Sequence, residues 1–153
     1  MIPGVLSMPT TASIHKTLSA GLVIVHHDGS RYRFLVLRAF SGWDFPKALV
    51  ADGEDAMTVA LRETRDATGI DELDLNWGDE YRETVPHEDG SISRYYIAQS
   101  KTMDVELRVP AGSEDDFEFR WVTAEEAEDV LPPRLAIVLD WAVRMLLSGA
   151  RSK

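Results

Sequence analysis

Residues 43–70 read WDFPKALVADGEDAMTVALRETRDATGI, and this stretch predicts an extended segment, a loop and a helix. Gly53 marks the loop, and Glu54 and Asp55 place carboxylates where the dipole of a following helix favours negative charge. Gly69 is a natural stop just past the end of that helix. The residues expected to face a core follow the i, i+3, i+4 rule and are Ala56, Met57, Ala60, Leu61 and Thr64.

A second face of the expected helix carries Val59, Glu63, Asp66 and Ala67. Glu63 and Asp66 are three residues apart, so their carboxylates are expected to lie one turn apart on the same side. Arg62 precedes Asp66 by four residues and is expected to pair with it on the surface. Because neighbouring carboxylates repel unless a cation lies between them, Glu63 and Asp66 predict a site for Mg²⁺ or Mn²⁺.

This stretch resembles the Nudix box, G-x5-E-x7-R-E-U-x-E-E-x-G-U, in which U is a bulky aliphatic residue. The positions that match outright are Glu54, Arg62, Glu63, Gly69 and Ile70. Asp66 is a conservative change, the spacing is intact, and the positions that depart are Ala48, Thr64 and Ala67. The resemblance implies that metals are held by Glu63, Asp66 and the residue at position 67, where alanine offers no ligand atom.

The composition restricts the classes of function. The chain has 153 residues, no cysteine and a formal net charge of −10. This charge argues against binding to a nucleic-acid polymer, which requires a basic surface, but it permits a small phosphorylated ligand bound through metal ions. Residues 1–17 are expected to form a flexible arm and residues 18–153 a single domain. No apolar run is long enough for a membrane span and no signal peptide is recognisable, so a cytoplasmic location is expected.

The remaining chain predicts more strands than helices. The expected strands are 19–26, 31–38, 71–77, 81–87, 92–99, 105–109 and 117–122. Thr123 and Glu126 form a capping-box pattern for a helix over 124–130, and Pro132-Pro133 precedes a last helix that ends at Gly149. These elements predict an α/β fold, a three-layer α/β/α sandwich with a mixed sheet, which is also the fold that the Nudix resemblance implies. Trp141 is expected to be exposed and to offer a surface on which a dimer could form. The sequence therefore leaves open whether the protein is a monomer or a homodimer.

Outside the box, the chain is similar to the diadenosine tetraphosphate hydrolase branch of the Nudix family. The matching segments are 19–24, Trp43-x-x-Pro46-Lys47 and Phe119-Arg120-Trp121. The resemblance implies that Tyr95 stacks on adenine, and that an acidic residue, best matched by Asp115, binds metal or activates water. Members of that branch carry a lysine in the segment that leads into the strand that contains Tyr95. This chain has Arg94 there instead, and Arg94 is expected to contact phosphate.

Two further residues have open roles. Lys47 is expected to contact phosphate or to be solvated, and Trp43 is expected to be a core residue or a surface for a base. The resemblance implies that Arg62 orients the glutamates.

The function that follows is metal-dependent hydrolysis of a phosphoanhydride in a small nucleotide, with a dinucleoside tetraphosphate as the best candidate. Other substrates, such as a capped RNA 5′ end, a diphosphoinositol phosphate or a nucleoside triphosphate, stay open. The alternative is a binding or regulatory module with weak or no activity, because Ala67 removes one metal ligand.

Overall fold

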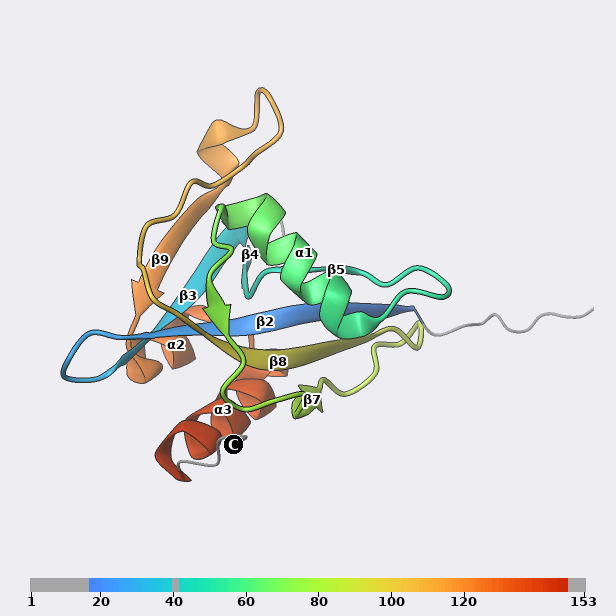
Figure 1. Cartoon of the computed structure of the whole chain (residues 1–153). Coiled ribbons are helices and arrows are strands. Elements are labelled where there is room, and N and C mark those ends of the chain that lie inside the picture. The colour runs from blue at the N-terminus through green and yellow to red at the C-terminus, as the bar shows by residue number, and fades with distance from the viewer. Residues whose placement is uncertain (1–16, 40–41, 149–153) are drawn as a thin grey trace, which may run out of the picture.

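The computed structural model describes residues 17–39 and 42–148, which form one mixed sheet between helices (Figure 1). The strands are β2 (Leu18–His27), β3 (Tyr32–Ala39), β4 (Gly42–Asp44), β5 (Lys47–Leu49), β6 (Leu73–Asp74), β7 (Tyr81–Glu83), β8 (Ile92–Ser100) and β9 (Glu118–Val122). The helices are α1 (Ala56–Thr68), α2 (Ala124–Val130) and α3 (Ala136–Ser148), with short 3₁₀ turns η2 (Glu114–Asp116) and η3 (Pro133–Leu135).

The centre of the sheet is the parallel pair β2 and β8, in register from Leu18↔Ile92 to Val25↔Gln99. β3 returns antiparallel to β2 after a tight turn, and its second half, including Leu37 and Arg38, pairs with β4 along one edge and with β9 along the other. β5 also pairs with β2, because its backbone lies against the first residues of that strand. The expected hairpin around residues 27–30 is therefore confirmed, and the sheet is mixed as predicted.

Two hydrophobic clusters lie on opposite faces of the sheet. The α1 face buries Ala20, Leu22 and Ile24 of β2 with the apolar side of α1, whereas the opposite face buries Val23 and Val25 beneath α2 and α3 (Figure 1). Burial of alternate residues on both faces explains why β2 reads as a continuous apolar run. The three-layer α/β/α prediction is confirmed.

The helix ends follow the sequence signals. Asp55 is the N-cap of α1 and accepts a hydrogen bond from the Thr58 backbone N–H, while Gly69 ends the helix with a left-handed φ of 78°. Thr123 and Glu126 form the predicted capping box of α2.

Segment 105–109 is not a strand, which corrects the sequence prediction. Its backbone donors bond to the end of α1 instead: Glu106 N–H donates to the Thr68 carbonyl and Arg108 N–H to the Ala67 carbonyl, each at 2.9 Å. The last carbonyls of a helix lack partners within the helix, so this segment satisfies them and leaves the sheet. The expected strands at 71–77 and 81–87 also shrink to β6 and β7.

Two burial predictions are wrong. Val59 is predicted to lie on the second face of α1, apart from the residues that face the core, but it is fully buried, because the helix is turned so that this side chain joins the core. Trp141 is only 6% exposed and packs in the core under the sheet, so it offers no surface for a dimer. The predicted arm at residues 1–17 lies almost entirely outside the described residues, as does the helix stop at Gly149. Among the described helices, none has the length and apolar character that crossing a membrane requires.

Candidate active site

A cleft of about 240 Å³ opens where the end of β3, the β4–β5 turn, α1 and the segment after β8 meet. Its polar lining consists of Arg38, Asp44, Lys47, Glu63 and Arg108. The cleft therefore brings a carboxylate of the box helix together with three cations from segments far apart in the sequence.

Glu63 projects from α1 into this cleft and is half-buried. Burial raises the pKa of its carboxyl group, the nearby Asp66 carboxylate raises that pKa further, and the Arg62 guanidinium opposes both effects. Within the described residues, Glu63 forms no hydrogen bond and no salt bridge. A carboxylate that is partly desolvated and lacks a partner is suited to bind a cation.

Few acidic side chains of the described residues lie where they could hold a metal. Asp66 is exposed and lies 3.8 Å from Arg65, and Ala67 lines the cleft without a ligand atom. The part of the chain that the structure describes contains no group of three or more histidine, cysteine or acidic side chains placed to hold a metal. Mg²⁺ is commonly bound by one or two carboxylates together with water and substrate phosphates. Glu63 and Asp66 therefore fit a metal that is shared with a phosphorylated substrate rather than one bound by protein alone.

Arg62 does not pair with Asp66, which corrects the sequence prediction. It donates instead to the Glu54 carboxylate at 3.0 Å, across the loop that precedes α1. The same carboxylate accepts from the Ala51 backbone N–H at 2.9 Å. These bonds, from Ala51 first and Arg62 second, lower the pKa of Glu54. The pair therefore fixes the loop in front of the box helix.

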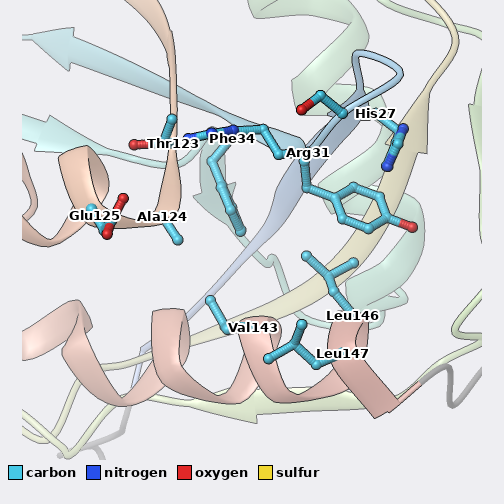
Figure 2. Close-up of a pocket in the computed structure, with 11 residues that line it drawn as sticks. His27, Arg31, Phe34, Thr123, Ala124, Glu125, Val143, Leu146 and Leu147 are labelled. Carbon is cyan, nitrogen blue, oxygen red and sulfur yellow. The ribbon is translucent and has the colours of Figure 1, made fainter.

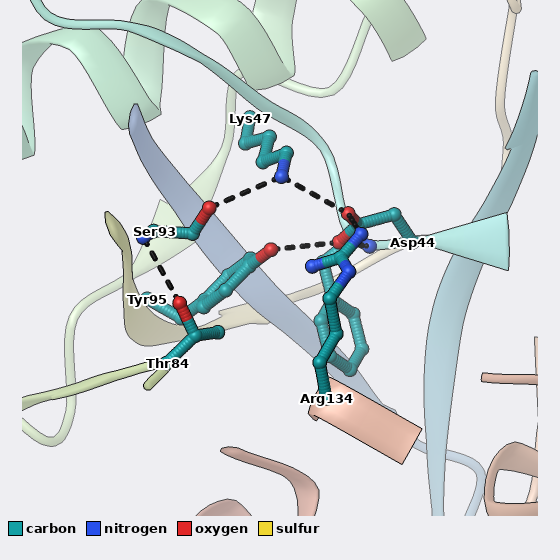
Figure 3. Close-up of polar contacts among 7 residues, drawn as sticks. Asp44, Lys47, Thr84, Ser93, Tyr95 and Arg134 are labelled. Atoms are coloured by element: carbon teal, nitrogen blue, oxygen red, sulfur yellow. Dashed lines mark hydrogen bonds and ion pairs between the residues drawn. The ribbon is translucent and has the colours of Figure 1, made fainter. Parts of the chain in front are cut away.

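Asp44 holds Lys47 at the edge of the cleft (Figure 3). Its carboxylate lies 3.3 Å from Lys47 Nζ and accepts hydrogen bonds from Arg134 Nη2 at 3.0 Å and from the Tyr95 hydroxyl at 2.8 Å. Lys47 also donates to Ser93 Oγ at 3.1 Å. Lys47 is thus held in place by two partners, and its ammonium lines the cleft where a phosphate could reach it.

Tyr95 is not a surface for adenine in this structure. Its side chain is fully buried and packs edge-on against Phe45, with 5.7 Å between ring centroids. Burial, followed by the neighbouring Asp44 carboxylate, raises the pKa of its hydroxyl far above the ordinary value. Tyr96 faces the opposite side of the sheet, as strand geometry predicts. The hydroxyl of Tyr95 instead donates a hydrogen bond to Asp44.

Trp43 and Arg94 are both engaged with neighbouring side chains. Trp43 is half-exposed, and the Arg120 guanidinium carbon lies 4.9 Å from its ring centroid. Arg94 is paired with Glu83 at 2.8 Å and lies over the Tyr81 ring at 4.2 Å. Neither residue lines the cleft, so their predicted contacts with base and phosphate stay predictions.

Asp115 lies in the 3₁₀ turn η2 and does not line the cleft, although Phe117 just after it does. The backbone carbonyl of Asp115 accepts a hydrogen bond from Arg38 Nη2 at 3.4 Å. The structure thus brings Lys47 and Glu63 together, with Asp66 one turn along α1, and leaves Asp115 at the margin.

Three polar residues of the cleft escaped the sequence analysis, namely Arg38, Asp44 and Arg108. Asp44 is adjacent to Trp43 in the quoted stretch, but its role depends on Tyr95 and Arg134, which are distant in sequence. Arg108 was assigned to a strand, and only its bond to the end of α1 turns it toward the cleft.

A second cavity, of about 530 Å³, lies between the β2–β3 turn, the start of α2 and the end of α3 (Figure 2). Most of its lining is apolar, with Phe34, Val143, Leu146 and Leu147 among the side chains. It contains none of the residues of the box, so the chemistry is assigned to the smaller cleft.

Comparison with known proteins identifies the family. Residues 15–142 match the NUDIX domain. The asymmetrical bis(5′-nucleosyl)-tetraphosphatase of Mus musculus is 35% identical over 106 residues, which is 65% of this chain and 70% of the relative, and its Sus scrofa counterpart is 33% identical over the same spans. A crystal structure of a C. elegans Ap4A hydrolase binary complex superposes with a TM-score of 0.72 at 26% identity, covering 85% of this chain and 98% of that one. The chain therefore belongs to the Nudix family and is a Nudix-type pyrophosphohydrolase.

Proposed function

We propose that this protein hydrolyses a dinucleoside tetraphosphate asymmetrically, so that diadenosine tetraphosphate yields ATP and AMP. The observation that carries the proposal is the cleft in which Glu63 faces Lys47, Arg38 and Arg108. Similarity to asymmetrical tetraphosphatases at 33–35% identity supports this choice of substrate. In the reaction, the oxygen of water bonds to phosphorus, a bridging P–O bond breaks, and one proton is released.

The proposed reaction uses Mg²⁺ or Mn²⁺, held by Glu63, Asp66 and the phosphates of the substrate. When bound, such an ion supplies charge neutralisation and a more acidic attacking water. Lys47 binds a phosphate with its ammonium, which Asp44 and Ser93 hold in position. Glu63 is also our candidate to accept the proton of water, because it is the acidic group of α1 that lines the cleft. Asp115 is the second candidate and would have to approach the cleft from η2.

The direct test is incubation of purified protein with diadenosine tetraphosphate and millimolar Mg²⁺ or Mn²⁺, with products separated by chromatography. We expect equal amounts of ATP and AMP, and no reaction in EDTA. Two equivalents of ADP would indicate symmetrical cleavage and would contradict the proposed outcome.

A substrate panel separates this proposal from the other open substrates. Nucleoside triphosphates, a capped dinucleotide and a diphosphoinositol phosphate should each give a lower kcat/KM than diadenosine tetraphosphate. No cleavage of any compound at high Mn²⁺, combined with ligand binding in EDTA, would instead identify a binding module.

A further inference from the structure

Arg108 is the one cation of the cleft without an acidic partner in the part of the chain that the structure describes. Arg38 is paired with Glu118 at 2.8 Å, and Lys47 is paired with Asp44 at 3.3 Å. Arg108 lines the same cleft, is exposed, and forms neither a salt bridge nor a side-chain hydrogen bond with the described residues. Its guanidinium is therefore available to a ligand.

The backbone fixes Arg108 beside the box helix. Its N–H donates to the Ala67 carbonyl at 2.9 Å, and the preceding bond from Glu106 N–H to the Thr68 carbonyl holds the same segment. Ala67 and Glu63 lie one turn apart on α1 and both line the cleft. Arg108 thus stands next to the helical position that contributes no carboxylate.

The charges of the cleft show why such a cation is needed. The carboxylates of Glu63 and Asp66 would offset the charge of a divalent ion. Lys47 and Arg38 are each already engaged with a carboxylate, Asp44 and Glu118, and each of these carboxylates is shared with a second arginine, Arg134 and Arg120. A polyphosphate carries several negative charges, so a cation of the cleft that is not engaged with a carboxylate is the one best placed to bind it. Arg108 is that cation, and its planar guanidinium can donate two parallel hydrogen bonds to phosphate oxygens.

We propose that Arg108 binds the polyphosphate of the substrate directly and provides positive charge that the two-carboxylate metal site does not. This inference rests on the proposed function only in taking a polyphosphate as the ligand class. It predicts that part of the phosphate affinity of this protein persists without metal.

Inorganic tripolyphosphate is the probe, because it tests phosphate binding independently of the nucleotide. Its affinity is measured by titration calorimetry in EDTA and again with Mg²⁺, for wild type, Arg108→Met, Arg108→Lys and the control Arg144→Met. Arg144 is an exposed arginine of α3 outside the cleft. Arg108→Met should weaken tripolyphosphate binding by about 10-fold in EDTA, since it removes charge-assisted hydrogen bonds. The affinity of Arg108→Lys for tripolyphosphate should lie between those of wild type and Arg108→Met. Arg144→Met should bind tripolyphosphate as tightly as wild type.

Unchanged tripolyphosphate affinity in Arg108→Met, or no binding by wild type in EDTA, would overturn the inference. The exposed position of Arg108 makes a folding defect unexpected, and equal melting temperatures of wild type and variants check this. As a second variant, Ala67→Glu places a carboxylate beside the guanidinium and should also weaken binding in EDTA. If tripolyphosphate binds through Arg108 while diadenosine tetraphosphate is not cleaved, the proposed substrate fails and this inference stands.

Discussion

Gly21 is where a single methyl group should disturb both the fold and the site. Gly21 lies in β2 opposite Lys47 of β5. A Cβ added there would lie 2.7 Å from Lys47 Cβ, and the Pro46 carbonyl oxygen would be closer still. That oxygen accepts a hydrogen bond from the Leu22 backbone N–H at 3.1 Å, which holds the approach in place. Glycine is therefore required here by a close backbone approach rather than by its dihedral angles.

The cost of Gly21→Ala follows from these distances. The Pro46-Lys47 backbone would have to retreat by about 1 Å to reach ordinary van der Waals contact. Overpacking of this kind destabilises by about 1–3 kcal/mol, and weakening the bond to Pro46 adds about 1 kcal/mol. Because Lys47 moves with its backbone, we also expect kcat/KM to fall by about 100-fold, the effect of a misplacement of this size at a reacting site.

Urea denaturation and steady-state hydrolysis of diadenosine tetraphosphate test this prediction together. Ser19→Ala is the matched control, since Ser19 is the other residue of β2 on the same face that pairs with β5. A Gly21→Ala protein whose free energy of unfolding lies within about 0.5 kcal/mol of wild type, with unchanged kcat/KM, would refute the reasoning.

Three further predictions follow from other contacts. Asp44→Asn removes the anionic partner of Lys47 while an oxygen remains for the Tyr95 hydroxyl, so KM for the polyphosphate should rise about 10-fold with kcat less affected; an unchanged KM would contradict the positioning role. Thr123→Ala removes the N-cap of α2 and should lower the free energy of unfolding by about 1 kcal/mol without changing turnover, as denaturation and activity assays would show. Hydrogen bonds from the Arg31 backbone, the Arg33 side chain and the Ser30 backbone lower the pKa of Asp28 well below 3.8. The charged Asp28 carboxylate therefore stabilises the folded protein fully above its ordinary pKa of 3.8, and this stabilisation is lost progressively as the pH falls below that value. Between pH 5 and pH 3 the unfolding midpoint of Asp28→Asn should therefore fall less than that of wild type. Equal falls would contradict the role assigned to Asp28.

Local sequence signals predicted the elements that depend on local chemistry. The ends of α1 and α2 follow from Asp55, Gly69 and the Thr123–Glu126 capping box, whose partners are within four residues. The two-sided burial of β2 follows from its unbroken apolar run. The position of Glu63 on the cleft side of α1 agrees with the spacing of the Nudix box.

Features that depend on distant partners could not be read from the chain. Segment 105–109 alternates like a strand, but its donors satisfy the end of α1. Tyr95 has the strand position expected of a stacking residue, yet Phe45 and Asp44 cover it. Arg62 has two acidic residues within reach, and the fold of the 51–54 loop selects Glu54. In each case a tertiary contact determines the role that spacing leaves open.

The most direct test of the central claim is the turnover of diadenosine tetraphosphate by Glu63→Gln at saturating Mg²⁺, compared with wild type. Glutamine preserves the shape of the side chain but neither binds a metal as a carboxylate nor accepts a proton. The account predicts that release of ATP and AMP falls by about 100-fold or more while the melting temperature stays close to that of wild type. Turnover within about threefold of wild type, a difference of less than 1 kcal/mol in barrier height, would show that the chemistry does not depend on this carboxylate and would contradict the assignment of the active site.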